Sequence, residues 1–377
     1  MIILDIHLQN FRNHADSLLR FGDGINLLLG ANGQGKTNVL EAVSYLGLTK
    51  SFYASSDLHV LRVGEPSFSL HGHLQSDGGV PHAVEITFDG TAPQKSVLID
   101  HSAPATMSSV IGRFPVVILS PEHHRITSGS PAERRRFLDL LLSQVSALYL
   151  EDIMQYRKVL RQRNRLLHDA RWRSGPIEDL LEPWTMNLAQ LGARVTVRRR
   201  DFVREFAEYV RRTYAFLAGE REEPSIEYCA AEEGTEAESV DEIAHKLREM
   251  MKDRWEDELR RGATMVGPHR DELKLTLNGL SVQQFASQGQ QKTFLVSLKM
   301  AEQSYLRERR NEQPIMLLDD LFGELDADRC GRILKRLEED GQCVITATDE
   351  HAFARAKSLP GACKRFMVDR GTVKEAA

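Results

Sequence analysis

The chain has 377 residues, of which 41% are hydrophobic, so it can bury a large core and divide into two lobes. No uninterrupted apolar stretch is long enough to span a bilayer, and residues 1–5 read as a strand rather than as a signal peptide. The four cysteines have no metal-ligand spacing, which predicts reduced, partly buried thiols in a cytoplasmic protein with no membrane partner.

The first part of the chain predicts a set of strands followed by helices. Alternating or continuous apolar runs indicate strands at residues 2–8, 25–29, 68–74, 83–88, 95–99 and 114–119. From residue 131 the period changes to that of helices. Apolar residues recur at spacings of three and four from Leu142 to Leu167, with Arg163 in one apolar slot, and predict one long amphipathic helix with two or three others packed on it. The heptads are too few for a long coiled coil.

The strand at residues 25–29 leads into a phosphate loop. The residues from Gly30 to Thr37 match the pattern G-x-x-x-x-G-K-[ST], and a helix is expected at 38–46. Backbone N–H groups of such a loop wrap phosphates, with Lys36 on the β- and γ-phosphates and the Thr37 hydroxyl on magnesium. The alternative is an ordinary glycine turn. The expected nucleotide contacts are Gly30, Ala31, Asn32, Gly33, Gln34, Gly35, Lys36, Thr37 and Asn38.

Charge is segregated along the chain despite a net charge of −5. Residues 157–173 hold seven Lys or Arg against one acid, a second arginine cluster spans 194–204, and residues 220–242 hold ten acids. Segregation of this kind allows binding to phosphate backbones. The alternative is that these arginines line the solvated sides of long helices. The DNA-contact candidates are Arg161, Arg163, Arg165, Arg198, Arg199 and Arg200.

Two segments near the end of the chain complete the predicted site. Ser287, Gly289 and Gln290 begin a helix that runs to about residue 309. The free N–H groups at this helix start suit a γ-phosphate. The alternative is a simple helix start, because Ser287 and Gln290 have the spacing of a capping box. An apolar strand at 314–318 ends in Asp319 and Asp320. Asp319 is expected to hold magnesium through water, and Asp320 to position the attacking water. A solvated acidic turn is the alternative.

These motifs resemble those of the RecF family, the recombination-repair ATPases related to SMC and ABC-type clamps. Three further segments resemble the family and follow its order along the chain: 10–13, 129–139 and 267–272. The resemblance spans nearly the whole chain. It departs from the family at Phe52 and Tyr53, where a His-Arg pair is expected after Ser51, and at Gly323, where serine is usual.

The resemblance implies an α/β fold: an ABC-type ATPase head with a mixed sheet and a phosphate loop, at residues 1–120 and 262–377, and an inserted compact α-helical arm lobe at 121–261. It implies ATP and Mg²⁺ as cofactors, with Lys36, Asp319 and Asp320 as catalytic residues. Arg12 is expected over the adenine or ribose, or alternatively paired with a neighbouring acid. Thr348 follows a buried strand at 344–347, where relatives carry a γ-phosphate sensor; its role is left open.

The implied mechanism is an ATP-dependent homodimer. Lys36 of one protomer and Ser287–Gly289 of the other would grip one nucleotide, so that the two arms close on double-stranded or gapped DNA. Slow, DNA-stimulated hydrolysis of ATP would then open the dimer and release the DNA. The resemblance implies RecR and RecO as partners in loading RecA, with roles in replication restart and the SOS response at the nucleoid.

Three other classes of protein are alternatives. The ATPase head of an overcoming-lysogenization-type nuclease would need an acidic metal-binding domain after Asp320, where about fifty residues are too few for a typical domain. A structural scaffold would not need Lys36 and Asp320 together. Nothing in the sequence supports a transporter motor docked on a membrane subunit.

Overall fold

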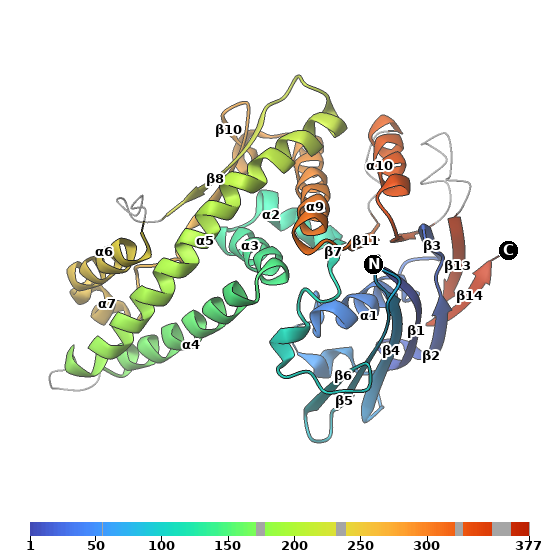
Figure 1. Ribbon diagram of the computed structural model, residues 1–377, viewed down its shortest axis with the longest axis horizontal. Helices are drawn as coiled ribbons and strands as arrows, with labels where there is room; N and C mark the ends of the chain where they lie inside the picture. The colour runs from blue at the N-terminus through green and yellow to red at the C-terminus, as the bar shows by residue number, and fades with distance from the viewer. Residues whose placement is uncertain (55, 171–177, 231–238, 321–326, 349–362, 377) are drawn as a thin grey trace. The chain divides into compact units, whose positions relative to one another are not determined.

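The computed structural model describes residues 1–54, 56–170, 178–230, 239–320, 327–348 and 363–376 (Figure 1). The chain divides into two compact units. The sheet unit comprises Met1–His124, Arg212–Glu222 and Gln288–Ala377, and the helical unit comprises Arg125–Arg211 and Glu223–Ser287.

These boundaries differ in three places from the expected ones. Residues 121–124 were expected in the arm, but they fall in the sheet unit. Residues 262–287 were expected in the ATPase lobe, but they fall in the helical unit because β9 (Glu272–Leu277) pairs with β8 (Pro224–Cys229). Residues 212–222 were expected in the arm, but they fall in the sheet unit, where Tyr214 packs against Phe294 with ring centroids 5.8 Å apart.

The sheet unit contains a six-stranded sheet of order β14-β13-β3-β12-β11-β7. Every strand pair in it is parallel except β13 with β14. All residues of β3, β7, β11 and β12 are buried, as their continuous apolar runs predict for strands covered on both faces. The carboxyl ends of β3, β12 and β11 therefore meet at one edge. The strands are β3 (Ile25–Leu29), β7 (Val116–Leu119), β11 (Ile315–Asp319), β12 (Cys343–Ala347), β13 (Cys363–Asp369) and β14 (Thr372–Ala376).

A second, antiparallel sheet in the same unit has the order β2-β1-β4-β5-β6. Helix α1 (Lys36–Leu48) contacts strands of both sheets, and its residues are almost all buried. Contact with β4 is close, because a Cβ on Gly72 would lie 2.3 Å from Leu46 Cδ1. The strands are β1 (Ile2–Phe11), β2 (His14–Arg20), β4 (Ser67–Gln75), β5 (Pro81–Asp89) and β6 (Gln94–Ile99). The remaining helices of the unit are η1 (Asp57–Val60), η2 (Met107–Val110), η3 (Pro121–His124), α9 (Gln288–Arg310) and α10 (Ala327–Glu339).

The helical unit is built on α4 and α5, which run side by side in Figure 1 and are joined by the contact of Arg194 with Asp152. The strand order β10-β9-β8 forms a small sheet, with Asn278 in the left-handed conformation at the turn between β9 and β10. Its elements are α2 (Arg125–Ser128), α3 (Pro131–Val145), α4 (Ala147–Ala170), α5 (Glu178–Ala218, whose last residues from 212 belong to the sheet unit), α6 (Val240–Asp253), α7 (Trp255–Arg261), α8 (Val282–Phe285) and β10 (Leu280–Ser281).

The prediction of one continuous helix from Leu142 to Leu167 was wrong. Ser146 separates α3 from α4: its N–H bonds the carbonyl of Leu142, and its hydroxyl accepts the N–H of Tyr149 at 3.2 Å. A serine that bonds the backbone on both sides ends one helix and begins the next, although the apolar spacing continues across the break.

The sequence also predicts reduced thiols and no membrane-spanning segment. All four cysteines are free thiols, and Cys330 and Cys343 are buried. None of the helices that the structure describes combines the length and apolar character needed to cross a bilayer.

Candidate nucleotide-binding site

The phosphate loop joins β3 to α1 at the carboxyl edge of the six-stranded sheet. The side chain of Lys36 lies beneath the loop, with Nζ donating to the carbonyls of Gly30 at 2.7 Å and Ala31 at 2.9 Å. Burial lowers the pKa of Lys36, while the nearby carboxylates of Asp319 and Asp320 act in the opposite direction. These contacts hold the lysine within the loop, and the N-terminus of α1 lies behind it.

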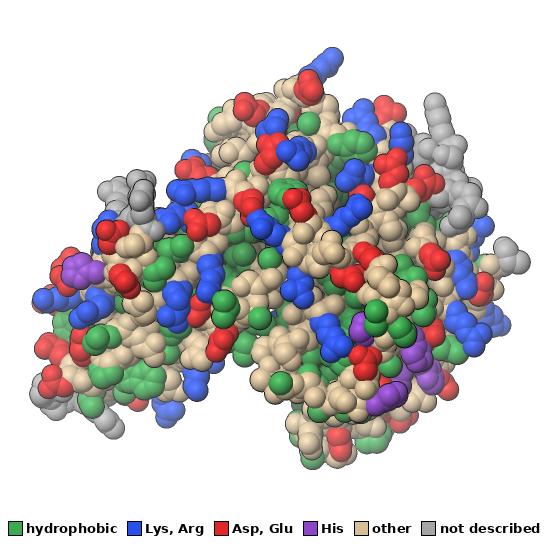
Figure 2. All heavy atoms as spheres, viewed as in Figure 1, with side chains coloured by type: hydrophobic (Ala, Val, Ile, Leu, Met, Phe, Trp, Pro, Cys, Tyr) green, Lys and Arg blue, Asp and Glu red, His purple; other side chains and the backbone are tan. Residues whose placement is uncertain are grey.

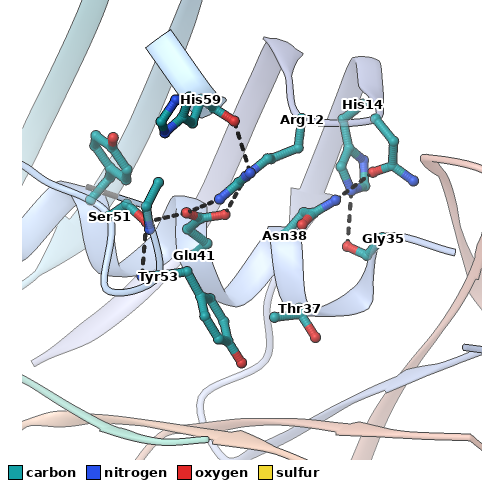
Figure 3. Close-up of polar contacts among 12 residues, drawn as sticks. Arg12, His14, Gly35, Thr37, Asn38, Glu41, Ser51, Tyr53 and His59 are labelled. Atoms are coloured by element: carbon teal, nitrogen blue, oxygen red, sulfur yellow. Dashed lines mark hydrogen bonds and ion pairs between the residues drawn. The ribbon is translucent and has the colours of Figure 1, made fainter. Parts of the chain in front are cut away.

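The turn between β1 and β2 and the first residue of β2 support the base of the loop (Figure 3). Asn13 Nδ2 donates to the carbonyl of Gln34 at 2.9 Å, and Asn38 Nδ2 donates to Asn13 Oδ1 at 2.7 Å. The ring of His14 contacts the carbonyl of Gly35 at 3.1 Å, and burial lowers the pKa of His14. Gly35 has φ 112°, and a Cβ there would lie 2.5 Å from Asn13 Oδ1, so no other residue fits without displacing the loop.

The turn between β13 and β14 also supports the loop. The N–H groups of Arg370 and Gly371 donate to the side-chain and main-chain oxygens of Gln34, at 2.8 and 2.9 Å. The hydroxyl of Ser17 donates to the carbonyl of Gly371 at 2.9 Å. The phosphate loop is therefore held by segments from both ends of the chain.

The carboxylate of Asp319 lies at the end of β11, facing the helix that follows the loop. The Thr37 hydroxyl is 2.8 Å from Asp319 Oδ1 and 3.0 Å from Oδ2. Thr346, at the register position beside Asp319 on β12, donates to Asp319 Oδ1 at 2.7 Å. The next residue, Asp320, is exposed with φ 49°, and its N–H donates to Thr346 Oγ1 at 3.0 Å.

Thr346 was not among the site residues predicted from the sequence. The available signal was a single hydroxyl in the otherwise apolar run 343–347 of a neighbouring parallel strand.

Tyr53 contributes a third hydroxyl to the same carboxylate. Its Oη donates to Asp319 Oδ2 at 3.0 Å, and burial raises the pKa of Tyr53, which keeps the group protonated as a donor. The ring of Phe52 lies beside that of Tyr53, with centroids 4.4 Å apart. The sequence marked these two residues only as departures from the family pattern.

Arg12 forms a two-point ion pair with Glu41 of α1 (Figure 3). Nε and Nη2 each lie 2.8 Å from a Glu41 oxygen, and Nη1 donates to the carbonyl of His59 at 2.8 Å. Glu41 is 1% exposed, and its hydrogen bonds raise the pKa of Arg12. Of the two alternatives for Arg12, the structure contains the pairing with an acid.

The expected contacts from the second protomer lie at the start of α9. Ser287, Gln288 and Gly289 are exposed there. Gln290 Nε2 instead donates to Glu222 at 2.6 Å, so this side chain is engaged within its own protomer. Thr348 is exposed after β12. Gly323, with the rest of segment 321–326, and Asp349 lie outside the described residues.

The oxygen atoms of Thr37 and Asp319 fit a magnesium ion, since Mg²⁺ takes oxygen ligands and is usually held by one or two protein groups together with phosphates and water. In the described part of the chain, no cluster of three or more His, Cys, Asp or Glu residues could enclose a metal. The donor set therefore suits a metal that arrives with a nucleotide.

The structure corrects two of the six DNA-contact candidates. Arg163 is 1% exposed and pairs with Glu258 at 2.7 Å, and Arg199 is 2% exposed and pairs with Asp139 at 2.7 Å. Both guanidinium groups lie inside the helical unit, where they cannot reach a DNA phosphate. The apolar slot that Arg163 occupies in the helical pattern is the physical reason, because that face of α4 points into the core.

The other four candidates differ in exposure. Arg198 pairs with Asp152, and Arg200 is 16% exposed beside Asp201, whereas Arg161 and Arg165 are exposed on α4. On the face drawn in Figure 2, the Lys and Arg side chains of the helical unit are interspersed with Asp and Glu side chains.

The fold and the site define a phosphate-loop ATPase head of the SMC type with an inserted helical unit. Residues 2–371 match the family model described as RecF/RecN/SMC N terminal domain. An Smc head domain superposes with a TM-score of 0.56 at 13% identity, covering 100% of this chain and 97% of that one, which shows the fold alone.

Closer relatives identify the family. The chain is 40% identical to the DNA replication and repair protein RecF of Salinibacter ruber, over 97% of this chain and 90% of the relative. It is 42% identical to that of Chloroherpeton thalassium, over 95% and 97%. A solved structure of the recombination mediator protein RecF with ATP, described as belonging to the RecFOR pathway, superposes with a TM-score of 0.91 at 31% identity, over 100% and 97%. The chain belongs to the RecF family.

Proposed function

We propose that this chain is an ATP-operated DNA clamp of replication and recombinational repair. The observation that carries the proposal is the contact of the Thr37 hydroxyl with the Asp319 carboxylate beside the phosphate loop. It supports the proposal because two oxygens of a kind that Mg²⁺ accepts lie beside the residue after Lys36, the lysine proposed to bind the terminal phosphates. The family relatives are named DNA replication and repair proteins, which supports the wider role.

The residues of the loop have distinct parts in binding ATP. Lys36 exchanges its bonds to the carbonyls of Gly30 and Ala31 for bonds to the β- and γ-phosphates. Thr37 and Asp319 hold Mg²⁺, which when bound offsets phosphate charge. Asp320, exposed at the end of β11, orients the attacking water. Hydrolysis at this site is slow and is stimulated by DNA.

The start of α9 supplies the contact that closes the dimer. Ser287 and Gly289 are exposed at a helix N-terminus, which favours a γ-phosphate from a second protomer. These contacts exist only in the ATP-bound dimer, so ATP shifts monomers toward dimers and hydrolysis reverses the shift.

The closed dimer holds double-stranded DNA, including the duplex beside a single-strand gap, through phosphate contacts of the helical unit. Arg161 and Arg165 are its best-placed contributors because both are exposed. RecR and RecO are the partners with which it helps load RecA, in replication restart and the SOS response. This role places the protein in the cytoplasm, at the nucleoid. The reference to the RecFOR pathway in the similar ATP-bound structure supports this assignment.

Molar mass in solution tests the proposal. Wild type is expected to double its mass with Mg²⁺ and ATP, whereas Ser287→Arg stays monomeric and still binds ATP. Glu308→Arg, at the far end of α9, serves as the control and dimerises like wild type. A wild-type chain that remains monomeric with saturating ATP and DNA contradicts the shared-site model.

Lys36→Met separates the clamp from the nuclease alternative. The folded variant is expected to lose both ATP binding and DNA binding. Metal-dependent cutting of DNA by the purified wild type would instead support the nuclease.

A further inference from the structure

We propose that Tyr53 is a positioning residue that holds the Asp319 carboxylate in the orientation that receives Mg²⁺ with the nucleotide. This inference rests on the proposed function and deepens it, because it assigns the metal affinity of the site partly to a side chain outside the phosphate loop and the strand end.

The geometry around Asp319 gives Tyr53 a specific part. Thr346 donates to Oδ1, and Thr37 lies within 3.0 Å of both oxygens. Tyr53 donates to Oδ2 at 3.0 Å. If the hydroxyl oxygen of Thr37 turns to a metal, Thr37 no longer donates its hydrogen bond to Asp319. Tyr53 and Thr346 then donate to one carboxylate oxygen each. Two fixed oxygens determine the plane of the carboxylate.

Tyr53 is itself held in place by its own loop. The Ser51 hydroxyl accepts the N–H groups of Tyr53 at 2.9 Å and Ala54 at 2.6 Å. It also donates to Glu41, the carboxylate paired with Arg12. A continuous set of contacts therefore runs from Arg12 to Asp319.

The anchor and the metal-binding hydroxyl share one helix. Glu41 and Thr37 are four residues apart on α1, so they lie on the same side of the helix. Figure 3 shows the side chains of Tyr53 and Thr37 pointing the same way, one from the loop and one from α1. The position of Tyr53 is thus fixed relative to the residue with which it shares Asp319.

The choice of tyrosine has an electrostatic consequence. A phenol is a neutral donor, so it orients Asp319 without cancelling its charge, whereas the arginine expected at this position would place a cation against the metal-binding carboxylate. Groups that hydrogen-bond to metal ligands and orient them typically contribute about 10- to 100-fold to metal affinity or activity.

The test compares Tyr53→Phe with Tyr45→Phe. The Tyr45 hydroxyl donates to Asp57 at 2.6 Å, so the control loses the same kind of tyrosine–aspartate bond in the same unit. Binding of a fluorescent ATP analogue is measured as Mg²⁺ is titrated, and again in EDTA; Mn²⁺ binding to the nucleotide complex, followed by EPR, gives a second readout. Thermal unfolding establishes that each variant is folded.

Tyr53→Phe is expected to need about 10-fold more Mg²⁺ for half-maximal binding, with a matching loss of Mn²⁺ affinity and with binding in EDTA within about twofold of wild type. Tyr45→Phe behaves as wild type in both conditions. Ser51→Ala, which keeps the Tyr53 hydroxyl but removes its anchor, shifts the Mg²⁺ requirement in the same direction by less.

An unchanged or lowered Mg²⁺ requirement in Tyr53→Phe overturns the role of Tyr53. An equal loss of binding in EDTA also overturns it, because the residue would then act on the nucleotide or on the fold. Wild-type protein that binds no ATP with Mg²⁺ contradicts the proposed function itself, so the two failures are distinct.

Discussion

Thr346 and Asp319 are neighbours in register on parallel strands, and the Thr346 hydroxyl donates a 2.7 Å hydrogen bond to the Asp319 carboxylate. The same hydroxyl accepts the N–H of Asp320 at 3.0 Å. One hydroxyl on β12 therefore contacts the carboxylate of Asp319 and the main chain of Asp320 at the end of β11.

Thr346→Val, which keeps the shape of the side chain, is expected to lower ATP hydrolysis about 10- to 100-fold with little change in unfolding temperature, because both acids lose a fixed partner. Steady-state phosphate release measures this. Thr346→Ser retains the hydroxyl and is expected to stay near the wild-type rate. A valine variant with wild-type turnover would show that the acids need no support from β12.

The buried pair of Arg163 and Glu258 is expected to stabilise the helical unit rather than bind DNA. Arg163→Ala leaves Glu258 as an uncompensated buried charge and should lower the free energy of unfolding by about 3–5 kcal/mol. Denaturant unfolding provides the measurement. The control Arg161→Ala, at an exposed position on the same helix, should change stability by less than about 0.5 kcal/mol. A stable Arg163→Ala protein with weakened DNA binding would reverse this assignment.

Arg161 and Arg165 are the exposed candidates for phosphate contacts. Replacing both with Gln should reduce the slope of log affinity against log salt by about two, and weaken binding roughly 10- to 100-fold near 0.1 M salt, if each contacts one phosphate. Fluorescence anisotropy with duplex DNA and saturating ATP measures both quantities. The charge-matched control, Arg20→Gln with Arg113→Gln in the sheet unit, should leave the slope unchanged; equal losses in the two pairs would indicate a non-specific charge effect.

His269 is expected to make the helical unit less stable in acid. Burial lowers the pKa of His269 to about 4, with Tyr156 Oη 2.6 Å from Nδ1 and the carbonyl of Thr264 3.1 Å from Nε2. The unfolded chain binds a proton at this histidine below about pH 6.5, whereas the folded chain does not until near pH 4. The associated stability is therefore complete above pH 6.5 and is lost as the pH falls.

The loss should reach roughly 2 kcal/mol between pH 7.5 and pH 5. The free energy of unfolding measured at several pH values should depend less on pH in His269→Gln than in wild type, whatever the absolute stability of the variant. His168→Gln, at an exposed position, should retain the wild-type dependence. Identical profiles for wild type and His269→Gln would place the acid sensitivity elsewhere.

Local patterns predicted most of the sheet unit and the centre of the site. A phosphate loop is a contiguous pattern, so Lys36 and Thr37 could be identified without the fold. The apolar run ending in Asp319 also located that carboxylate, because parallel strands end at a common edge.

The remaining contacts depend on pairings between distant segments. Arg163 occupies an apolar slot of the helical pattern, but nothing near it in the sequence indicates that Glu258 will meet it in the core. Tyr53 reaches Asp319 only because its loop is anchored to α1 through Ser51. The break at Ser146 was hidden because the apolar period continues through it, while the main-chain N–H of Ser146 ends α3 and its hydroxyl caps α4.

The two-residue connection between β13 and β14 would ordinarily be a good place to insert a label or a peptide, as exposed tight turns usually tolerate added residues. Here Arg370 and Gly371 hold Gln34 through their main-chain N–H groups, and a Cβ on Gly371 would lie 2.2 Å from the carbonyl of Asn13. Lengthening this hairpin would therefore disturb nucleotide affinity from the opposite end of the polypeptide, and a reporter group is better attached elsewhere.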